Sequence, residues 1–406
     1  MENMQWIFQT IIVSCFVIFC GGEFIPFKHL GLHHTDPDVL RNVTQIIASR
    51  GYPVEEHHVT TEDGFILALQ RIPRGRNEKE SSSRKEVVFL QHGLLADATN
   101  WIIDTPTRSL GYMLADSGYD VWLGNIRGND YSRRHVKYSP HQSKFWNWSW
   151  QEMAKYDLPA MINYVLKVTG EEQLYYVGHS QGTLIGFTGF SENPALGEKI
   201  KIFFALAPVY TLNHCTDIAK GAAKLIYPLV KKLFPGMTFD LLPGNFLRAL
   251  VNLGFCANPI SERVCYDFME LTIGMDSENI NKSRVPVYLG HFAEGTSFKD
   301  VVHFAQLIVN KKCQKFDYGE AGNMKHYNQA TAPLYNVKDM TTPTVLFVGA
   351  HDVLGDPADA AALKPQISNL IHYEVIPGWN HLDFLYGIDA AKILYPKILY
   401  TMEKFE

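Results

Sequence analysis

A glycine-flanked serine between two apolar runs constrains this chain more than any other feature. Residues 174–177 form a strand-like run, residues 178–182 read Gly-His-Ser-Gln-Gly, and a helix-like run begins at residue 181. A G-x-S-x-G motif after a strand and before a helix is typical of a sharp turn that exposes the serine hydroxyl above a sheet. Side chains larger than glycine at positions 178 and 182 would collide with neighbouring elements in so tight a turn. Ser180 is therefore the candidate nucleophile.

Strand-like and helix-like segments alternate on both sides of this motif, which predicts an α/β fold with a mostly parallel central sheet. One hairpin is expected at residues 54–72. The other expected strands are residues 87–90, 119–123, 174–177, 200–209, 344–349 and 371–376, and the expected helices are residues 150–168, 181–192 and 389–403. We expect residues 23–210 and 341–406 to form the core.

The alternation breaks at residues 211–340, which predicts a mostly helical cap or lid domain over the carboxyl edge of the sheet. Within it, residues 220–234 have apolar side chains on one half of a helical wheel and lysines on the other, and Pro228 should kink that helix. This stretch is either a surface helix packed on its own core or a movable amphipathic lid that meets lipid.

A serine hydroxyl needs a base that takes its proton, and the base needs a carboxylate that orients it. His381 lies in the loop after the expected strand 371–376, and Asp352 directly follows the expected strand 344–349. The chain order Ser180, Asp352, His381 is that of α/β-hydrolases rather than of the two common serine-protease scaffolds. Asp356 and Asp383 are alternative acids, although Asp383 is too close to His381 in sequence to reach its ring easily.

A tetrahedral oxyanion needs two backbone donors. One is expected to be the N–H of Gln181, which follows the nucleophile. The other is expected from the loop after the strand 87–90, where Gly93 lets the backbone turn in and Leu94 offers its N–H. His92 is expected to brace this loop rather than to transfer protons.

The N-terminus predicts export. Residues 6–20 are mostly apolar but too few to span a bilayer, so residues 1–22 are interpreted as a signal peptide, although no Lys or Arg precedes the run. An uncleaved anchor or a buried helix is the alternative. Three N-glycosylation sequons, at Asn42, Asn147 and Asn281, agree with secretion.

Cysteines and charge narrow the remaining possibilities. Four cysteines follow the signal segment: Cys256 and Cys265 could close a short disulfide loop, and Cys215 and Cys313 could pair or stay free. No cysteine–histidine spacing indicates a metal site. The net charge of −5 without a basic stripe makes nucleic acid an unexpected partner.

Taken together, these motifs resemble those of the acid lipase family of α/β-hydrolases, which includes gastric and lysosomal lipases. The resemblance runs from about residue 33 to residue 405. It is carried by these segments: Gly51 to Gly64, His92 to Leu95 with Asn100 and Trp101, Gly124 to Gly128, Tyr156 to Pro159, Gly178 to Gly182, Ala207 and Pro208, Asp356 and Pro357, and Asn380 to Phe384.

The resemblance implies a capped α/β-hydrolase fold that hydrolyses triacylglycerols, cholesteryl esters or related esters at a lipid–water interface. It implies no metal and no organic cofactor. No obligate protein partner is evident from the sequence. The expected destination of the protein is the extracellular space, such as a gut lumen, or the lysosome. The family triad matches Ser180, Asp352 and His381, and its oxyanion donors match Leu94 and Gln181.

The family disulfide matches Cys256 and Cys265, and a family glycosylation site matches Asn281. This chain departs from the pattern at Ile273, where vertebrate members commonly have a cysteine, and Cys215 and Cys313 look additional. Rival interpretations are a catalytically silent lipid-binding protein, a short-chain carboxylesterase and an acyltransferase on the same fold. A trypsin-like peptidase is not expected, because nothing marks a pocket for a charged side chain.

Overall fold

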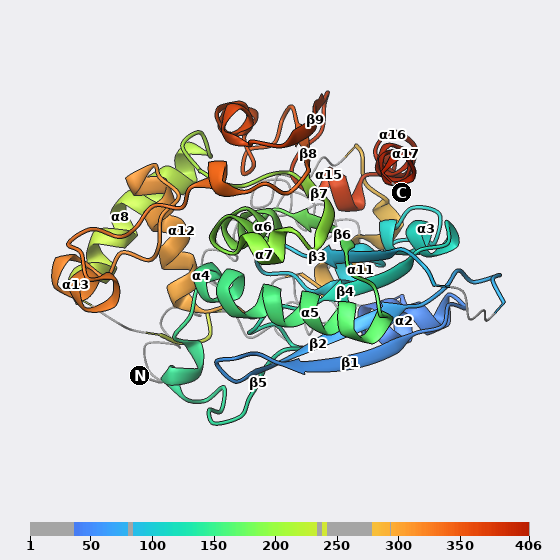
Figure 1. Cartoon of the computed structure of the whole chain (residues 1–406), viewed down its shortest axis with the longest axis horizontal. Helices are drawn as coiled ribbons and strands as arrows, with labels where there is room; N and C mark the ends of the chain where they lie inside the picture. The colour runs from blue at the N-terminus through green and yellow to red at the C-terminus, as the bar shows by residue number, and fades with distance from the viewer. Residues whose placement is uncertain (1–35, 80–83, 234–237, 242–277, 293, 406) are drawn as a thin grey trace, which may run out of the picture.

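The structure is a computed structural model that describes residues 36–405 except 80–83, 234–237, 242–277 and 293. Within this part of the chain, one sheet has the strand order β1-β2-β4-β3-β6-β7-β8-β9, with β5 beside β2. From β4 to β9 all neighbouring strands are parallel, whereas β2 is antiparallel to β1, β4 and β5. The predicted mostly parallel α/β fold is therefore confirmed (Figure 1).

The strand predictions hold closely. The hairpin is β1 (Glu55–Thr60) and β2 (Phe65–Ile72), and the other strands are β3 (Val87–Gln91), β4 (Asp120–Gly124), β5 (Arg134–His135), β6 (Leu174–His179), β7 (Ile200–Leu206), β8 (Thr344–Gly349) and β9 (Leu370–Ile376). The strand predicted to run to residue 209 ends at Leu206, and the two-residue β5 has too short a pattern to be seen in the sequence.

Helices cover both faces of the sheet. One face carries α2 (Val43–Ser49), α3 (Leu110–Asp116), α11 (Val285–Gly290), α15 (Asp383–Tyr386), α16 (Ala390–Ile393) and α17 (Tyr395–Lys404). The other carries α4 (Trp150–Glu152), the π-helical turn η5 (Met153–Asp157), α5 (Leu158–Thr169), α6 (Gln181–Glu192), α7 (Pro194–Gly197) and α14 (Pro357–Leu363).

Two predicted helices are less regular than their sequence pattern suggested. The helix predicted at residues 150–168 contains the π-helical turn η5 between α4 and α5. The helix predicted at residues 389–403 is divided into α16 and α17, and Pro396 lies in the first turn of α17. A proline is tolerated there because the N–H it lacks would have no partner within the helix.

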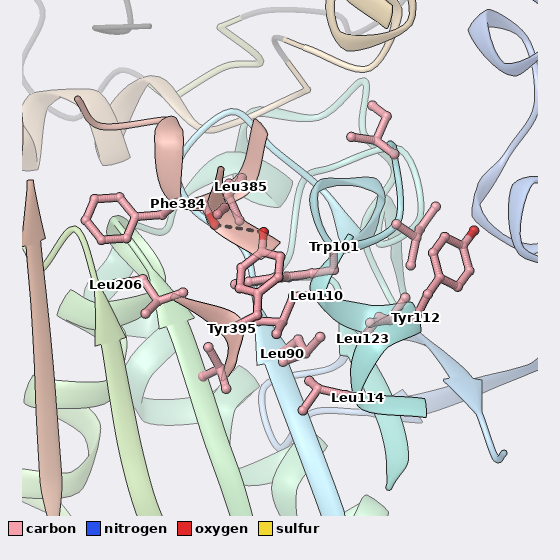
Figure 2. Packing of buried hydrophobic residues seen from close by; sticks show 14 of the residues in the cluster. Leu90, Trp101, Leu110, Tyr112, Leu114, Leu123, Leu206, Phe384, Leu385 and Tyr395 are labelled. Carbon is pink, nitrogen blue, oxygen red and sulfur yellow. Dashed lines mark hydrogen bonds between the residues drawn. The ribbon is translucent and has the colours of Figure 1, made fainter. Parts of the chain in front are cut away.

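Alternating strand residues separate two hydrophobic cores. Val88 and Leu90 of β3 face the core beneath α3 and α17, while Val87 and Phe89 face the core beneath α5 and α6. Figure 2 shows the first core, in which Leu90, Leu206 and Tyr395 pack together with residues of α3 and α15. There the Tyr395 hydroxyl donates a hydrogen bond of 3.0 Å to the Phe384 carbonyl.

The 211–340 segment enters the chain between β7 and β8. Its helices α8 (Asp217–Leu233), α12 (Phe298–Asn310) and α13 (Glu320–Tyr327) gather at one end of the molecule, on the left of Figure 1. Its helix α11, in contrast, packs into the core beside the sheet. The segment is therefore anchored in the core as well as extended beyond it. Its boundaries as a separate domain stay a prediction, as does the signal peptide, which lies outside the described residues.

No helix in the described ranges is both long enough and apolar enough to cross a membrane.

A buried ion cluster joins the hairpin to the helical layer. The Arg127 guanidinium donates to Asp63 in the β1–β2 turn at 2.6 and 2.9 Å and to Asp157 at the end of η5 at 2.6 and 2.9 Å. Arg127 and Asp157 are both fully buried. Burial raises the pKa of Asp157 although Arg127 opposes that shift, whereas the pKa of Asp63 lies below its usual value because Arg127 outweighs burial. Three segments of the family resemblance therefore meet in this cluster.

We expect Arg127→Met to lower the free energy of unfolding by about 3–5 kcal/mol, because it leaves two carboxylates without their buried counter-charge. Chemical denaturation at neutral pH measures this loss. Arg134→Met is the matched control, since Arg134 is exposed on β5 and its replacement should cost less than about 1 kcal/mol. Equal losses from the two variants would contradict the role assigned to the cluster.

Candidate active site

The predicted nucleophile lies in a strained turn at the carboxyl end of β6. Ser180 has φ 54° and ψ −119°, a backbone conformation with positive φ that residues other than glycine rarely adopt. A Cβ at Gly178 would lie 2.8 Å from the backbone of Gly182, and a Cβ at Gly182 would lie 2.5 Å from the Gln91 carbonyl oxygen. Both positions therefore require glycine, for the steric reason expected from the sequence.

Asp352 and His381 form a buried pair at the ends of β8 and β9. The carboxylate oxygens of Asp352 lie 3.0 and 2.9 Å from His381 Nδ1. The N–H groups of Leu354 and Gly355 donate to the same carboxylate at 2.8 and 2.7 Å. Burial favours a higher pKa for Asp352, but these hydrogen bonds and the nearby imidazole hold it below the usual value. Asp352 is thus ionised and orients the ring of His381.

The two alternative acids have other partners. Asp356 caps α14 by accepting the N–H of Ala358 at 2.8 Å. Asp383 accepts the N–H of Asn380 at 2.6 Å and the side-chain amide of Asn279 at 3.2 Å. Of the three aspartates considered, Asp352 is the one that meets the imidazole of His381.

His179 connects the turn of Ser180 to the loop of His381. Its Nε2 lies 2.9 Å from the His381 carbonyl oxygen, and the two imidazole rings are 4.9 Å apart. Because a carbonyl only accepts, Nε2 must carry the proton. Burial, together with the neighbouring His381, lowers the pKa of His179 to about 3, so this residue is neutral and serves as a fixed donor. The residue before the nucleophile therefore positions the candidate base.

The loop after β3 lies directly against Ser180. A Cβ at Gly93 would lie 3.0 Å from Ser180 Cβ, closer than most Cβ contacts, so glycine favours this approach. His92 Nδ1 lies 2.8 Å from the Gly93 carbonyl oxygen, and its Nε2 accepts the N–H of Ile126 at 3.3 Å. Burial lowers the pKa of His92 to about 4, which keeps the ring neutral. The bracing role expected for His92 agrees with these contacts.

The candidate donor Leu94 is followed by Leu95, which has φ 57°. The Leu95 carbonyl accepts the N–H of Glu294 at 3.0 Å, and Glu294 belongs to the 211–340 segment. The strained loop is thus held in place from the segment that the sequence predicts as a cap.

The other candidate donor, Gln181, meets a carboxylate that sequence reasoning missed. Its side-chain Nε2 donates to Asp300 Oδ2 at 2.8 Å, and the N–H of Trp150 donates to Asp300 Oδ1 at 2.6 Å. Asp300 is fully buried, and burial raises its pKa to about 7 although both hydrogen bonds oppose the shift. Asp300 lies 119 residues from Gln181 in the chain and belongs to no motif, so the sequence carries no signal for this contact.

The predicted glycosylation sites and cysteines differ in exposure, and some lie outside the described residues. Asn42 and Asn147 are exposed, and Asn281 is half-buried with its side-chain nitrogen donating to Asp104 at 3.0 Å. Cys215 and Cys313 are both buried free thiols. Cys256 and Cys265 lie outside the described residues, so their disulfide stays a prediction. Within the described ranges, no group of three His, Cys, Asp or Glu residues could hold a metal ion.

Comparisons with known proteins agree on the class. Residues 86–388 match the family described as the alpha/beta hydrolase fold, and residues 43–105 match a partial alpha/beta-hydrolase lipase region. Among solved structures, a protein of Sulfolobus solfataricus has a TM-score of 0.55 at 16% identity, covering 87% of this chain and 94% of its own. The alpha/beta hydrolase GrgF of a Penicillium species has a TM-score of 0.51 at 14% identity, covering 87% of this chain and 97% of its own. The chain is therefore an α/β-hydrolase.

Closer relatives narrow this class. The chain is 44% identical to human lipase member K, covering 98% of this chain and 99% of the relative. It is 47% identical to human lysosomal acid lipase/cholesteryl ester hydrolase (91% and 93% covered) and 45% identical to rat gastric triacylglycerol lipase (97% and 98% covered). The chain therefore belongs to the acid lipase family of α/β-hydrolases, and it is a hydrolase of the lipase class.

The raised pKa of Asp300 predicts a pH dependence of stability. Its pKa is about 7 in the folded chain against an ordinary value of 3.8, so folding retains a proton between these values. The stabilisation is complete below about pH 4 and is lost as the pH rises through about 7. An asparagine side chain does not titrate. We therefore expect Asp300→Asn to gain stability relative to the wild type as the pH rises over this interval, on the order of a few kcal/mol.

Urea denaturation of both proteins at pH 4.5, 6.0 and 7.5 measures the difference. A stability difference that stays constant over this range would contradict a buried, protonated Asp300.

Proposed function

We propose that this chain hydrolyses carboxylic esters of lipids, triacylglycerols or cholesteryl esters, with Ser180 as nucleophile, His381 as base and Asp352 as the orienting acid. The observation that carries the proposal is the buried contact between Asp352 and His381 Nδ1, in the loop that His179 ties to the turn of Ser180. A carboxylate on Nδ1 leaves Nε2 free to accept a proton, which is the tautomer that a serine nucleophile requires.

The proposed reaction has two steps. His381 Nε2 takes the proton of the Ser180 hydroxyl as its oxygen attacks the ester carbonyl, and the resulting imidazolium returns the proton to the departing alcohol. A water molecule, deprotonated by His381, then attacks the acyl-enzyme. The bond between the acyl group and the Ser180 oxygen breaks, the fatty acid leaves, and His381 gives the proton back to Ser180. The ionised Asp352 stabilises the imidazolium in both steps.

The oxyanion of each tetrahedral intermediate would accept hydrogen bonds from the backbone N–H groups of Leu94 and Gln181. Two features of these residues support this assignment. Gly93 brings the first loop against Ser180, and Gln181 begins α6, whose N-terminal N–H groups favour negative charge.

The lipid substrate class is proposed from the relatives, whose names include a triacylglycerol lipase and a cholesteryl ester hydrolase. Helix α8 supports contact with a lipid–water interface. Its Leu225 is 75% exposed, and the helix continues across Pro228. An exposed leucine on an amphipathic helix is suited to inserting among acyl chains.

An ester panel tests the function. The wild type should hydrolyse long-chain triacylglycerol or cholesteryl oleate emulsions, and Ser180→Ala should lower kcat by about 10³–10⁶-fold. Activity confined to acetate and butyrate esters would instead indicate a short-chain carboxylesterase. Bound fatty ester without turnover at any pH from 4 to 8 would indicate a silent lipid-binding protein, and ester transfer to added alcohol would indicate an acyltransferase.

Two histidine variants serve as an internal control for the base. His381→Ala should lose activity to a similar extent as Ser180→Ala. His351→Ala should keep it, because the His351 side chain is exposed and it is the ring of His381 that meets Asp352. Loss of activity in His351→Ala with retention in His381→Ala would contradict the assignment.

We also propose that the chain enters the secretory pathway through residues 1–22 and is secreted or delivered to lysosomes. The relatives named gastric and lysosomal lipases support this destination. N-terminal sequencing of the protein recovered from eukaryotic cells should find a chain that begins near residue 23. A mature protein that retains Met1 would contradict cleavage.

A further inference from the structure

One short stretch of the 211–340 segment contacts the candidate oxyanion donor Gln181 and the residue that follows the other candidate, Leu94. At its start, the N–H of Glu294 donates to the carbonyl of Leu95, the residue after Leu94. At its end, the Asp300 carboxylate accepts the side-chain amide of Gln181 at 2.8 Å. We call residues 294–300 the brace. The two loops that it joins come from β3 and β6, whose ends carry the two donors.

We propose that Asp300 is a positioning residue for ester hydrolysis: through the side chain of Gln181 it fixes the backbone N–H of residue 181 in the oxyanion site. The inference rests on the proposed function, because it assigns a role within that reaction. Asp300 itself would not touch the substrate.

Three hydrogen bonds hold the side chain of Asp300 in place. Its Oδ1 accepts the N–H of Trp150 at 2.6 Å, and its Oδ2 accepts Gln181 Nε2 at 2.8 Å and the Thr296 hydroxyl at 3.2 Å. The donors come from α4, from the first residue of α6 and from the brace. Asp300 is fully enclosed, so water cannot replace these partners. A side chain held in this way has one orientation, which is what preorganised donors require.

Gln181 depends on Asp300 for its orientation. Its side chain is completely buried, and its Oε1 has no hydrogen-bond partner in the described structure, so the bond from Nε2 to Asp300 is the polar contact that holds the amide. The backbone at this point follows the strained Ser180, which has little tolerance for rotation. Release of the amide would let the first turn of α6 relax and move the N–H of residue 181. Displacement of one oxyanion donor costs rate rather than substrate affinity.

The alternative is that Asp300 only docks the 211–340 segment on the core. The two roles differ in what the variants should do. A docking role predicts a loss of stability with kcat unchanged for the folded fraction. A positioning role predicts a loss of kcat that passes through Gln181 and can be restored by a residue that still holds the amide.

The test uses the full-length mature protein and a water-soluble monomeric ester, p-nitrophenyl butyrate, so that binding to an interface plays no part. Asp300→Ala should lower kcat about tenfold to a hundredfold with KM within about threefold of the wild type. Gln181→Ala keeps the backbone N–H but frees it from the brace, and should lower kcat to a similar extent. The double variant should be no more than about twofold below the lower single variant, because both changes break the same link.

Asp300→Asn provides the rescue. Its Oδ1 can still accept the N–H of Trp150, and its Nδ2 can donate to Gln181 Oε1 once the glutamine amide rotates. We expect kcat within about threefold of the wild type. Thr238→Val is the matched control for docking. It removes a different hydrogen bond from the 211–340 segment to the core, 2.6 Å from the Thr238 hydroxyl to the Ser143 carbonyl, and should leave kcat unchanged.

Three results would overturn the proposal: a wild-type kcat in folded Asp300→Ala, multiplied losses in the double variant, or a wild-type kcat in Gln181→Ala. The kcat of Gln181→Ala distinguishes positioning from docking even if Asp300→Ala does not fold. These results differ from failure of the proposed function, in which the wild type itself, or Ser180→Ala, behaves contrary to expectation on the ester panel.

Discussion

The candidate catalytic residues lie at one edge of the sheet because the strands that precede them are parallel. β3, β6, β8 and β9 run in the same direction, so the loops that follow them meet at one edge of the sheet. Residues far apart in sequence are thereby brought together: Gly93 against Ser180, and Asp352 against His381. The sheet beneath them is packed on both faces, and this packing stabilises the strained Ser180 backbone and the enclosed carboxylate of Asp352.

Much of this arrangement could be predicted from the sequence because it depends on local patterns. The strand–turn–helix context of Ser180 and the apolar strands before Asp352 and His381 were visible in the residues themselves, and the sheet was predicted nearly strand by strand. The sequence alone does not distinguish among Asp352, Asp356 and Asp383 by pattern, because all three follow or flank a strand. The contacts favour Asp352, because it meets the ring of His381, whereas Asp356 caps a helix and Asp383 accepts the N–H of Asn380.

The parts that sequence could not supply are long-range polar contacts. Asp300 and Glu294 carry no motif, and their partners lie in other elements of the chain. The same holds for Arg127, which marks the family resemblance in sequence but whose bonds to Asp63 and Asp157 appear only in the fold. Asp300 and Glu294 tie the 211–340 segment to the site, so a segment that reads as an insertion also supports the candidate catalytic edge, while Arg127 ties the hairpin to the helical layer.

The proposed activation of Ser180 by His381 can be tested with a covalent label. After treatment with a lipid-like p-nitrophenyl phosphonate, digestion and mass spectrometry should find one equivalent of adduct, on the peptide that contains Ser180. The label should be lost in His381→Ala. An inactivated enzyme whose adduct lies on another residue, or a native enzyme that takes up no label while hydrolysing esters, would contradict the role assigned to Ser180.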